Sequence, residues 1–290
     1  MFKNYLSLIK FSHTLFALPF AVIGFFLATH SNSSLINNPE HHGALKLFVL
    51  VLLCMIFARS AAMAFNRWTD QKFDGENIRT KVREIPSGII SSQNAFTFVV
   101  INCILFVATT FFINRICFYL SPVAVAVILG YSYTKRFTPL CHFILGLGLS
   151  LAPIGAFLAV TGEFKWLPLL YSFIVLFWVS GFDIIYALQD EEFDRSKNLK
   201  SIPVLLGKKN ALWLSRSLHL LAASIVIYAG YYAQFHVWYW IGSAIFILLL
   251  IFQQSLVKPN DLSKVTLAFA TTNGIASVVF AVFVLLEIFL

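Results

Sequence analysis

Long apolar stretches separated by short polar connections run through this 290-residue chain. A helix needs about 20 apolar residues to cross the hydrocarbon layer of a bilayer, and inside that layer its backbone groups must be hydrogen-bonded within the segment. The sequence predicts spans at residues 12–30, 44–65, 94–113, 116–134, 140–160, 166–189, 211–232, 237–256 and 266–289. We therefore expect an all-α polytopic membrane protein with about nine transmembrane helices in a single domain, residues 1–290.

The composition supports this class. Hydrophobic residues make up 59% of the chain, charged residues 12%, and the mean hydropathy is +0.81, whereas soluble domains have roughly 25% charged residues. The first apolar stretch follows Lys3 and Lys10, as in a signal peptide, but it is long and has no clear small-x-small cleavage site, so we expect a retained span. The four cysteines are scattered through predicted spans and indicate packing residues rather than a metal site or disulfides.

The distribution of basic residues predicts the orientation. With a cytoplasmic N-terminus, 17 of the 21 Lys and Arg residues fall on the cytoplasmic side and 3 on the other, with Arg59 inside the second span. Positive residues concentrate in the cytoplasmic connections of membrane proteins. The net charge of +8 is therefore a topology signal, and nothing in the sequence indicates nucleic-acid binding or a protein partner.

Two acidic segments stand out against this apolar background. The first is Asn66-x3-Asp70-x3-Asp74, at the exit of the second span, and the other contains Asp183, Tyr186, Asp190 and Asp194, at the exit of the sixth. Four spans separate them, an even number, so both are expected to open to the same side of the membrane. The recurrence predicts two pseudo-repeated halves, roughly 1–135 and 136–290, with paired sites facing each other.

The spacing of these acids predicts a site for a metal ion and a phosphate. Residues four apart share one face of a helix, and Mg²⁺ combines a few carboxylates with waters and substrate phosphate oxygens. Basic side chains would cover the remaining phosphate oxygens. The candidate clamps on the same side are Lys72, Arg79, Arg83, Lys135 and Arg136. Asp183 lies deepest in an apolar helix, so a solvated loop role is least plausible there, whereas that role suits Glu76, Glu84, Glu191 and Glu192.

The roles of Arg59 and of the histidines are not determined by their spacing. Arg59 lies two turns before Asn66 on roughly the same helix face. A cation at this depth is expected either to pair with an acid of the cluster or to meet an anionic acceptor. The seven histidines show no metal-ligand spacing beyond the adjacent His41 and His42, and we assign them no role.

The two acidic segments resemble the signatures of a known family. Arg59-Ser-Ala-Ala-Met-Ala-Phe-Asn66-Arg-Trp-Thr-Asp70-Gln-Lys-Phe-Asp74 is similar to the first signature of the UbiA superfamily of intramembrane prenyltransferases. Gly181-Phe-Asp183-Ile-Ile-Tyr186-Ala-Leu-Gln189-Asp190-Glu-Glu-Phe-Asp194 is similar to the second, and Tyr131-Ser-Tyr-Thr-Lys135-Arg136-Phe-Thr to the loop after the fourth span. The pattern departs from the best-known one where Arg67 follows Asn66 in place of an acid and where Arg83-Glu84-Ile85-Pro86 replaces an Arg-Pro-x-Pro-like segment.

This resemblance implies a helical bundle around a central cavity and Mg²⁺-dependent transfer of a polyprenyl group from its diphosphate to an acceptor, usually aromatic. By motif match, Asn66, Asp70 and Asp74 would hold one Mg²⁺–diphosphate contact, and Asp190 and Asp194 the other. Asp183 and Tyr186 occupy the remaining positions of the second signature. Arg83, Lys135 and Arg136 match basic residues near the diphosphate. The resemblance also implies the bacterial inner membrane, with the active site facing the cytoplasm.

The acceptor and one other class of protein are left open. The chain resembles 4-hydroxybenzoate polyprenyltransferases of quinone biosynthesis, which serve ubiquinone, and its second segment also resembles enzymes that prenylate naphthoate-type acids on the way to menaquinone. Acidic residues within repeated helices also occur in cation-coupled transporters. However, the acids here gather at one face, and no paired Gly- or Pro-broken helices stand out. A purely structural scaffold does not explain two matched carboxylate segments.

Overall fold

The computed structural model describes residues 2–9, 16–31 and 42–290, and within these ranges the chain is built of helices. The described part forms no β-sheet and has one isolated bridge, between Lys258 and Asp261. The all-α prediction is therefore confirmed. The long helices are α2 (Leu18–Ser31), α3 (His42–Thr69), α5 (Ser92–Phe111), α6 (Arg115–Thr134), α7 (Cys141–Thr161), α8 (Trp166–Ala187), α10 (Ile202–Ala233), α11 (Val237–Leu256) and α12 (Asn273–Phe289).

These helices correspond to the predicted spans. Within the described residues, eight are long and apolar enough to cross a membrane, and α2 is a shorter apolar helix inside the first predicted span. Residues 12–15 of that span lie outside the described part. Short helical segments complete the chain: α1 (Phe2–Leu8), α4 (Gln71–Glu76), the 3₁₀ turn η3 (Leu188–Asp190), α9 (Glu191–Ser196) and the π-helical turn η4 (Leu267–Thr272).

Side-chain caps fix several helix starts. The Ser91 hydroxyl accepts a hydrogen bond from the Asn94 N–H at 3.2 Å, and Asn114 Oδ1 accepts one from the Cys117 N–H at 2.9 Å. Such caps satisfy amides that have no partner in the first turn of a helix. Asn114 also donates from Nδ2 to the carbonyl of Leu158 at 2.8 Å. This residue therefore ends the short connection between α5 and α6 and ties it to α7.

The start of α10 differs from the prediction, which placed this span over 211–232. The helix begins at Ile202, where the Ser201 hydroxyl accepts from the Val204 N–H at 3.4 Å and Pro203 occupies the first turn. Proline suits this position because its missing N–H would be unpaired there anyway. Gly207, with φ +74°, interrupts the helix, and Lys208 and Lys209 interrupt its apolar pattern, which is why the periodicity missed its first turns.

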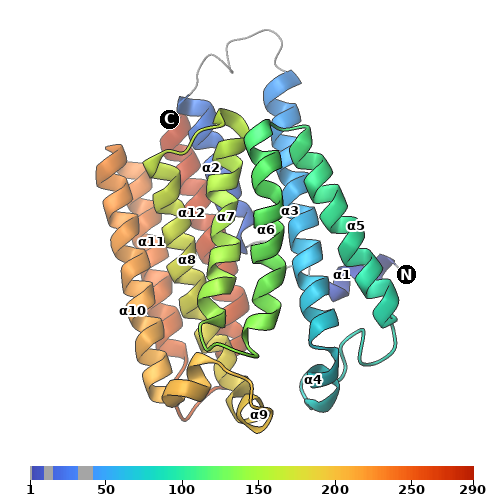
Figure 1. Ribbon diagram of the computed structural model, residues 1–290. Coiled ribbons are helices and arrows are strands. Elements are labelled where there is room, and N and C mark those ends of the chain that lie inside the picture. Colours follow the sequence, from blue (N-terminus) through green and yellow to red (C-terminus); the bar gives the residue numbers. More distant parts are fainter. Residues whose placement is uncertain (1, 10–15, 32–41) are drawn as a thin grey trace.

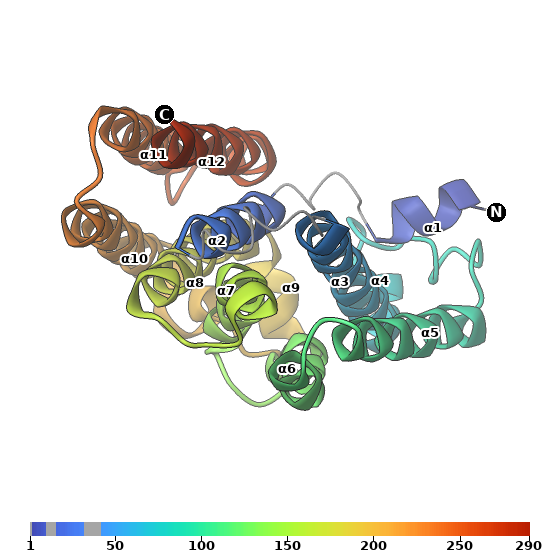
Figure 2. The same cartoon turned by 90° about the horizontal axis from the view of Figure 1, so that it is seen from above.

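The core of the bundle lies around α8. Trp178, Tyr171, Phe246 and Phe280 are fully buried and belong to one apolar cluster. Helix α7 packs between α2 and α8, and seen from above, α3, α5 and α6 stand to one side and α10 to α12 to the other (Figure 2). Short α4 and α9 lie at the same end of the bundle (Figure 1). Both acidic segments therefore reach one end, as predicted.

Candidate active site

The two acidic segments share a local backbone design. At the end of α3 the helix breaks at Asp70, with φ −95° and ψ 6°, and at the end of η3 it breaks at Asp190, with φ −104° and ψ 3°. This sparsely populated region is frequent among active-site residues. The Asp70 N–H still donates to the Asn66 carbonyl at 3.0 Å, and the Asp74 N–H to the Asp70 carbonyl at 2.8 Å. The four-residue register of the carboxylates therefore continues across the break.

Both segments line one cavity of about 600 Å³. Twelve of the thirteen predicted site residues line it: Arg59, Asn66, Asp70, Asp74, Arg79, Arg83, Lys135, Arg136, Asp183, Tyr186, Asp190 and Asp194. Lys72 does not line it and is exposed. Lys72 follows Asp70 by two residues and lies on another face of the turn, so the predicted charge is present but directed away from the cavity.

Each of the four carboxylates predicted as metal ligands is paired with a basic side chain. Arg79 donates to both oxygens of Asp190, from Nε at 3.1 Å and from Nη2 at 2.6 Å. Arg79 also donates from Nη1 to the Tyr186 hydroxyl at 3.1 Å. Asn77 adds a longer contact to Asp190, at 3.4 Å.

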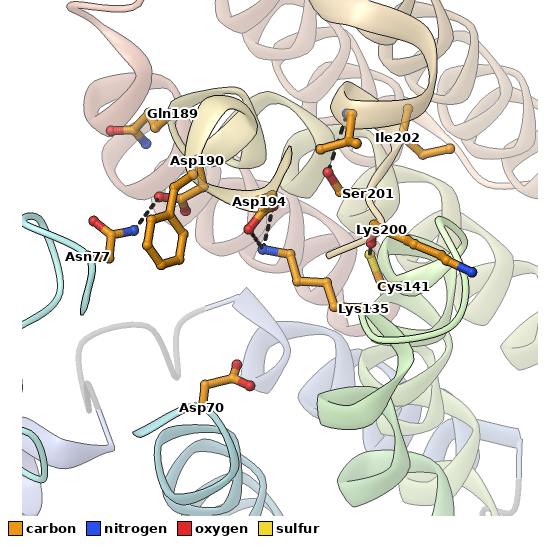
Figure 3. A network of polar contacts seen from close by, with 12 residues as sticks. Asp70, Asn77, Lys135, Cys141, Gln189, Asp190, Asp194, Lys200, Ser201 and Ile202 are labelled. Atoms are coloured by element: carbon orange, nitrogen blue, oxygen red, sulfur yellow. Dashed lines mark hydrogen bonds and ion pairs between the residues drawn. The ribbon is translucent and has the colours of Figure 1, made fainter. Parts of the chain in front are cut away.

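The remaining pairs follow the same pattern. Arg83 Nη1 lies 2.7 and 2.8 Å from the two oxygens of Asp74. Lys135 Nζ lies 2.9 and 2.7 Å from those of Asp194, and Arg136 Nη2 lies 3.4 Å from Asp70. Figure 3 shows Lys135 directed toward Asp194, with Asp70 across the gap from Asp190 and Asp194. The cavity therefore holds a nearly balanced set of carboxylates and cations, contributed by both halves of the chain.

The pKa values of two of these groups, Asp70 and Lys135, are raised above their ordinary values. Burial, reinforced by the nearby Asp74, raises the pKa of Asp70 to about 6. Burial alone would lower the pKa of Lys135, but the adjacent Asp194 carboxylate outweighs it and raises that pKa. Lys135 therefore stays charged, whereas Asp70 takes up a proton in mildly acidic solution.

Asp183 pairs with a histidine that sequence reasoning did not single out. His142 Nδ1 lies 2.7 Å from Asp183 Oδ2, and the Ile202 N–H donates to His142 Nε2 at 3.3 Å. Since Nε2 accepts, the hydrogen of a neutral ring is on Nδ1, facing Asp183. The His142 side chain is 2% exposed and that of Asp183 20%. A histidine near the start of one span and an acid in the next gave no spacing signal, because the contact is 41 residues distant along the chain.

Two arginines in the cavity wall have no acidic partner within the described residues: Arg59 and Arg67. Nε of Arg59 and Nη1 of Arg67 are buried without a hydrogen bond, and neither residue forms an ion pair with the part of the chain that the structure describes. Of the two roles predicted for Arg59, pairing with a cluster acid is therefore not observed there.

A second, mostly apolar cavity of about 400 Å³ adjoins the first. It is lined from α3, α6 and α7, and Arg59, Met63, Tyr131, Leu145 and Leu149 line both cavities. Arg59 therefore lies at the boundary between the polar cavity and the apolar one. Such a pair of chambers suits an amphiphilic ligand that carries a charged head and an apolar chain.

A bundle of long apolar helices with carboxylates and cations facing one another in a cavity defines a multi-pass membrane protein with a charged internal chamber. Comparison with known proteins places it further: residues 17–285 match the model of the UbiA prenyltransferase family. The chain belongs to this family, and it is a prenyltransferase. The transporter and scaffold alternatives raised by the sequence are thereby set aside.

Individual relatives agree with this assignment. The chain is 28% identical over 246 residues to a 4-hydroxybenzoate octaprenyltransferase of Aliivibrio fischeri (strain MJ11), covering 83% of each protein. It is 29% identical over 235 residues to the protein of that name from Nitrosomonas eutropha, covering 81% of this chain and 82% of the relative.

Solved structures share the fold. The apo structure of a UbiA homolog from Aeropyrum pernix K1 matches with a TM-score of 0.79 and 29% identity, over 95% of this chain and 96% of that one. A UbiA homolog from Archaeoglobus fulgidus bound to DMAPP and Mg²⁺ matches with a TM-score of 0.76 over 98% and 99% of the two chains. At 22% identity, the latter likeness concerns the fold alone.

Proposed function

We propose that this prenyltransferase transfers a polyprenyl group from polyprenyl diphosphate to an aromatic carboxylic acid, with 4-hydroxybenzoate as the first candidate acceptor. The observation that carries the proposal is the convergence of both acidic segments and four cations on one chamber beside an apolar cavity. The relatives named 4-hydroxybenzoate octaprenyltransferase support the acceptor. A naphthoate-type acid is the alternative, because the second acidic segment resembles that branch.

The donor set fits Mg²⁺. Asn66, Asp70 and Asp74 on one wall and Asp190 and Asp194 on the other offer hard oxygen ligands, and carboxylate oxygens are what Mg²⁺ prefers. In the described residues no three His, Cys, Asp or Glu side chains form a ready metal cage. Each ion would therefore take few protein oxygens and complete its shell with phosphate and water. When bound, it would neutralise the charge of the diphosphate.

The chain's own cations act on the leaving group. Arg79, Arg83, Lys135 and Arg136 line the chamber and are held by carboxylates. When the C–O bond of the prenyl diphosphate breaks, both electrons leave with the diphosphate, where positive side chains stabilise the developing negative charge. The allylic carbon becomes electron-deficient, and a carbon of the acceptor ring attacks it to form the new C–C bond.

Aromatic side chains near the reacting carbon would protect this cation. Phe16, Phe182, Tyr186 and Phe269 line the chamber. Their ring centroids lie 5.6 Å apart for Phe16 and Phe182, 5.5 Å for Phe182 and Phe269, and 4.2 Å for Tyr186 and Phe269. Ring faces attract cations, and an apolar wall excludes water that would capture the allylic carbon.

After the new C–C bond forms, a base must accept a proton from the acceptor ring. Among the predicted site carboxylates, Asp183 pairs with a histidine, whereas the others pair with arginine or lysine. Asp183 is also the one acid of the set that is not proposed to hold Mg²⁺, so we assign it as the proton acceptor. The proton released as the ring regains aromaticity passes to Asp183, whose position is held by the hydrogen bond from His142.

For the location, we propose the bacterial inner membrane with the chamber opening to the cytoplasm, supported by the basic residues around this end of the bundle. A cysteine introduced at exposed Lys81, in a chain whose native cysteines are replaced, tests the orientation. It should react with an impermeant thiol reagent in inverted vesicles and be protected in intact cells. Labelling in intact cells would reverse the orientation.

The reaction is tested in membranes that contain the full chain, supplied with polyprenyl diphosphate, Mg²⁺ and either 4-hydroxybenzoate or a dihydroxynaphthoate. A prenylated benzoate that disappears with EDTA, with Asp70→Ala and with Asp190→Ala supports the proposal. Product only with the naphthoate moves the enzyme to the alternative acceptor. No product with either acid, from protein shown to be folded, refutes the proposed reaction.

A further inference from the structure

Arg67 is a buried cation that forms no ion pair with the described part of the chain. It lies in the last turn of α3, is 5% exposed and lines the polar chamber. Its Nη1 is buried without a hydrogen-bond partner. A buried charge that lacks a partner is unfavourable in the ligand-free protein, so a role in holding the fold together does not account for this side chain.

The other cations of the chamber behave differently. Arg79, Arg83, Lys135 and Arg136 each lie within ion-pair distance of an aspartate. They therefore pair with four of the carboxylates that line the chamber. Arg67 forms no such pair in the described part of the chain, at a place where the substrate is expected to bring negative charge.

The carboxylates near Arg67 form no ion pair with it. Asp74 and Glu84 act on it from a distance, and Arg83 repels it. Asp74 already accepts two hydrogen bonds from Arg83, and Glu84 Oε1 accepts one from Ser7 at 2.5 Å. Glu84 Oε2 is buried without a partner, so Glu84 is the competing counter-ion that an experiment has to exclude.

We propose that Arg67 binds a diphosphate oxygen of the prenyl donor directly, as an anchor that does not depend on the metal ion. The inference rests on the proposed function, because it takes the donor to be a prenyl diphosphate. A guanidinium presents a planar fork of N–H donors that matches phosphate oxygens. Arg67 follows Asn66 and precedes Asp70 by less than one turn, so it lies beside the proposed metal ligands.

Arg59 and Arg67 lie at different depths, which assigns the diphosphate of the donor and the carboxylate of the acceptor to different arginines. Eight residues of α-helix place Arg59 and Arg67 about 12 Å apart along the helix axis. Arg59 lines both cavities, whereas Arg67 lines only the polar one. The diphosphate therefore belongs with Arg67 at the acidic end of the chamber, and the acceptor carboxylate with Arg59 at the boundary with the apolar cavity.

The test measures binding of inorganic pyrophosphate to the purified full chain in EDTA, by the rise in thermal denaturation temperature and by calorimetry. The variants are Arg67→Gln and Arg67→Lys. The matched control is Arg115→Gln, which removes an exposed arginine at the opposite end of α6. We expect pyrophosphate to stabilise the wild type and the control without metal. We expect Arg67→Gln to raise the Kd for pyrophosphate at least about tenfold, as for loss of a hydrogen bond between charged groups. The Kd of Arg67→Lys should lie between those of the wild type and Arg67→Gln.

A second readout separates ligand binding from a structural role. The ligand-free Arg67→Gln protein should be at least as thermally stable as the wild type, because it loses an unpaired buried charge. Lower ligand-free stability together with an undiminished pyrophosphate response would overturn the proposal. Glu84→Gln should leave the pyrophosphate response intact; if it removes that response as fully as Arg67→Gln, Arg67 serves Glu84 and the proposal is wrong.

Failure of this inference can be told from failure of the proposed function. If the wild type binds pyrophosphate only when Mg²⁺ is present, the metal-independent anchor is refuted while the diphosphate site stands. If neither pyrophosphate nor prenyl diphosphate binds with Mg²⁺, and no prenyl transfer occurs, the proposed function itself is refuted. If Arg67→Gln does not fold, Arg67→Lys decides by the same measurements.

Discussion

Arg79 and Asp190 form a two-point ion pair across the chamber, with Nε to Oδ1 at 3.1 Å and Nη2 to Oδ2 at 2.6 Å. The two residues are 111 positions apart and join the loop after α4 to the end of η3. Arg79 thus covers the carboxylate atoms that are proposed to hold Mg²⁺. In the proposed function, Mg²⁺ would compete with Arg79 for the Asp190 oxygens, and a guanidinium released from Asp190 would bind the diphosphate.

Replacing Arg79 with glutamine should impair use of the prenyl donor. We expect kcat/KM for polyprenyl diphosphate to fall about 10- to 100-fold, because charge-assisted hydrogen bonds to the leaving group are lost. The measurement is steady-state prenyl transfer with the donor varied at saturating acceptor. Arg195→Gln is the control, since Arg195 is exposed and pairs within its own helix with Glu191. Equal loss in both variants would mean that Arg79 has no special role.

The acidity of Asp70 predicts a pH dependence. Its pKa is raised to about 6, chiefly by burial, and protons compete with a metal for the carboxylate. Below pH 6 the apparent Mg²⁺ affinity should fall, approaching tenfold per pH unit. The check is the Mg²⁺ concentration for half-maximal transfer between pH 5 and pH 8. A requirement for Mg²⁺ that does not change over this range would show that Asp70 is not a metal ligand.

The same pKa makes a prediction about stability. A carboxyl whose folded pKa lies above its ordinary value of 3.8 destabilises the fold when it is ionised. This penalty is fully present above pH 6 and disappears as the pH falls below 4. Asp70→Asn should therefore stabilise the ligand-free protein at pH 7.5 and do so progressively less toward pH 4. Thermal denaturation across this range tests the sign, and a gain that grows as the pH falls would contradict it.

The hydrogen bond between His142 and Asp183 predicts a graded mutant series. His142→Asn offers an amide near the position of Nδ1 and should retain part of the activity, whereas His142→Leu should lose about 10²-fold in kcat, the scale of general-base contributions. KM for the prenyl diphosphate should change little in either variant, because His142 acts through Asp183. The pH profile of kcat should shift in His142→Leu. A loss confined to thermal stability, with an unchanged pH profile, would assign His142 a structural role.

Much of this architecture follows from the sequence, because hydrocarbon imposes a length and a polarity on each span. The acids at the ends of α3 and α8 were predictable as a pair from their spacing. The two-halves prediction stays a prediction, although Asp70 and Asp190 break their helices with nearly the same φ and ψ.

Other features depend on tertiary contacts that spacing does not encode. Both Lys72 and Lys135 are predicted as clamps from their position in the sequence, but only Lys135 lines the chamber, because the loop after α6 carries it toward Asp194. The role of His142 depends on how α7 packs beside α8. The missing partner of Arg67 is a property of the folded chamber and has no sequence signal beyond the unusual Asn66-Arg67 pair.

Close packing of α2 against α7 predicts a stability defect. A Cβ on Gly24 would lie 2.1 Å from the Pro153 carbonyl oxygen, which is backbone and cannot rotate away. Small residues allow membrane helices to approach this closely. Gly24→Ala should destabilise the protein by about 1–3 kcal/mol, the usual cost of overpacking. Gly130→Ala on α6, where nothing lies within 4 Å, is the control, and equal thermal denaturation of the two variants would contradict the packing argument.

The placement of Arg59 between the two cavities predicts acceptor selectivity. Its guanidinium has no acidic partner in the described part of the chain, and its Nε has no hydrogen bond. In Arg59→Gln, KM for the aromatic acid should rise about 10- to 100-fold, as expected for loss of a bond to a charged group, while KM for the prenyl diphosphate stays nearly constant.

A neutral analogue, 4-hydroxybenzamide, provides the discriminating measurement. Wild type and Arg59→Gln should use the amide about equally, because it has no carboxylate to lose. If the variant is equally impaired with the acid and with the amide, Arg59 shapes the chamber rather than binding the carboxylate.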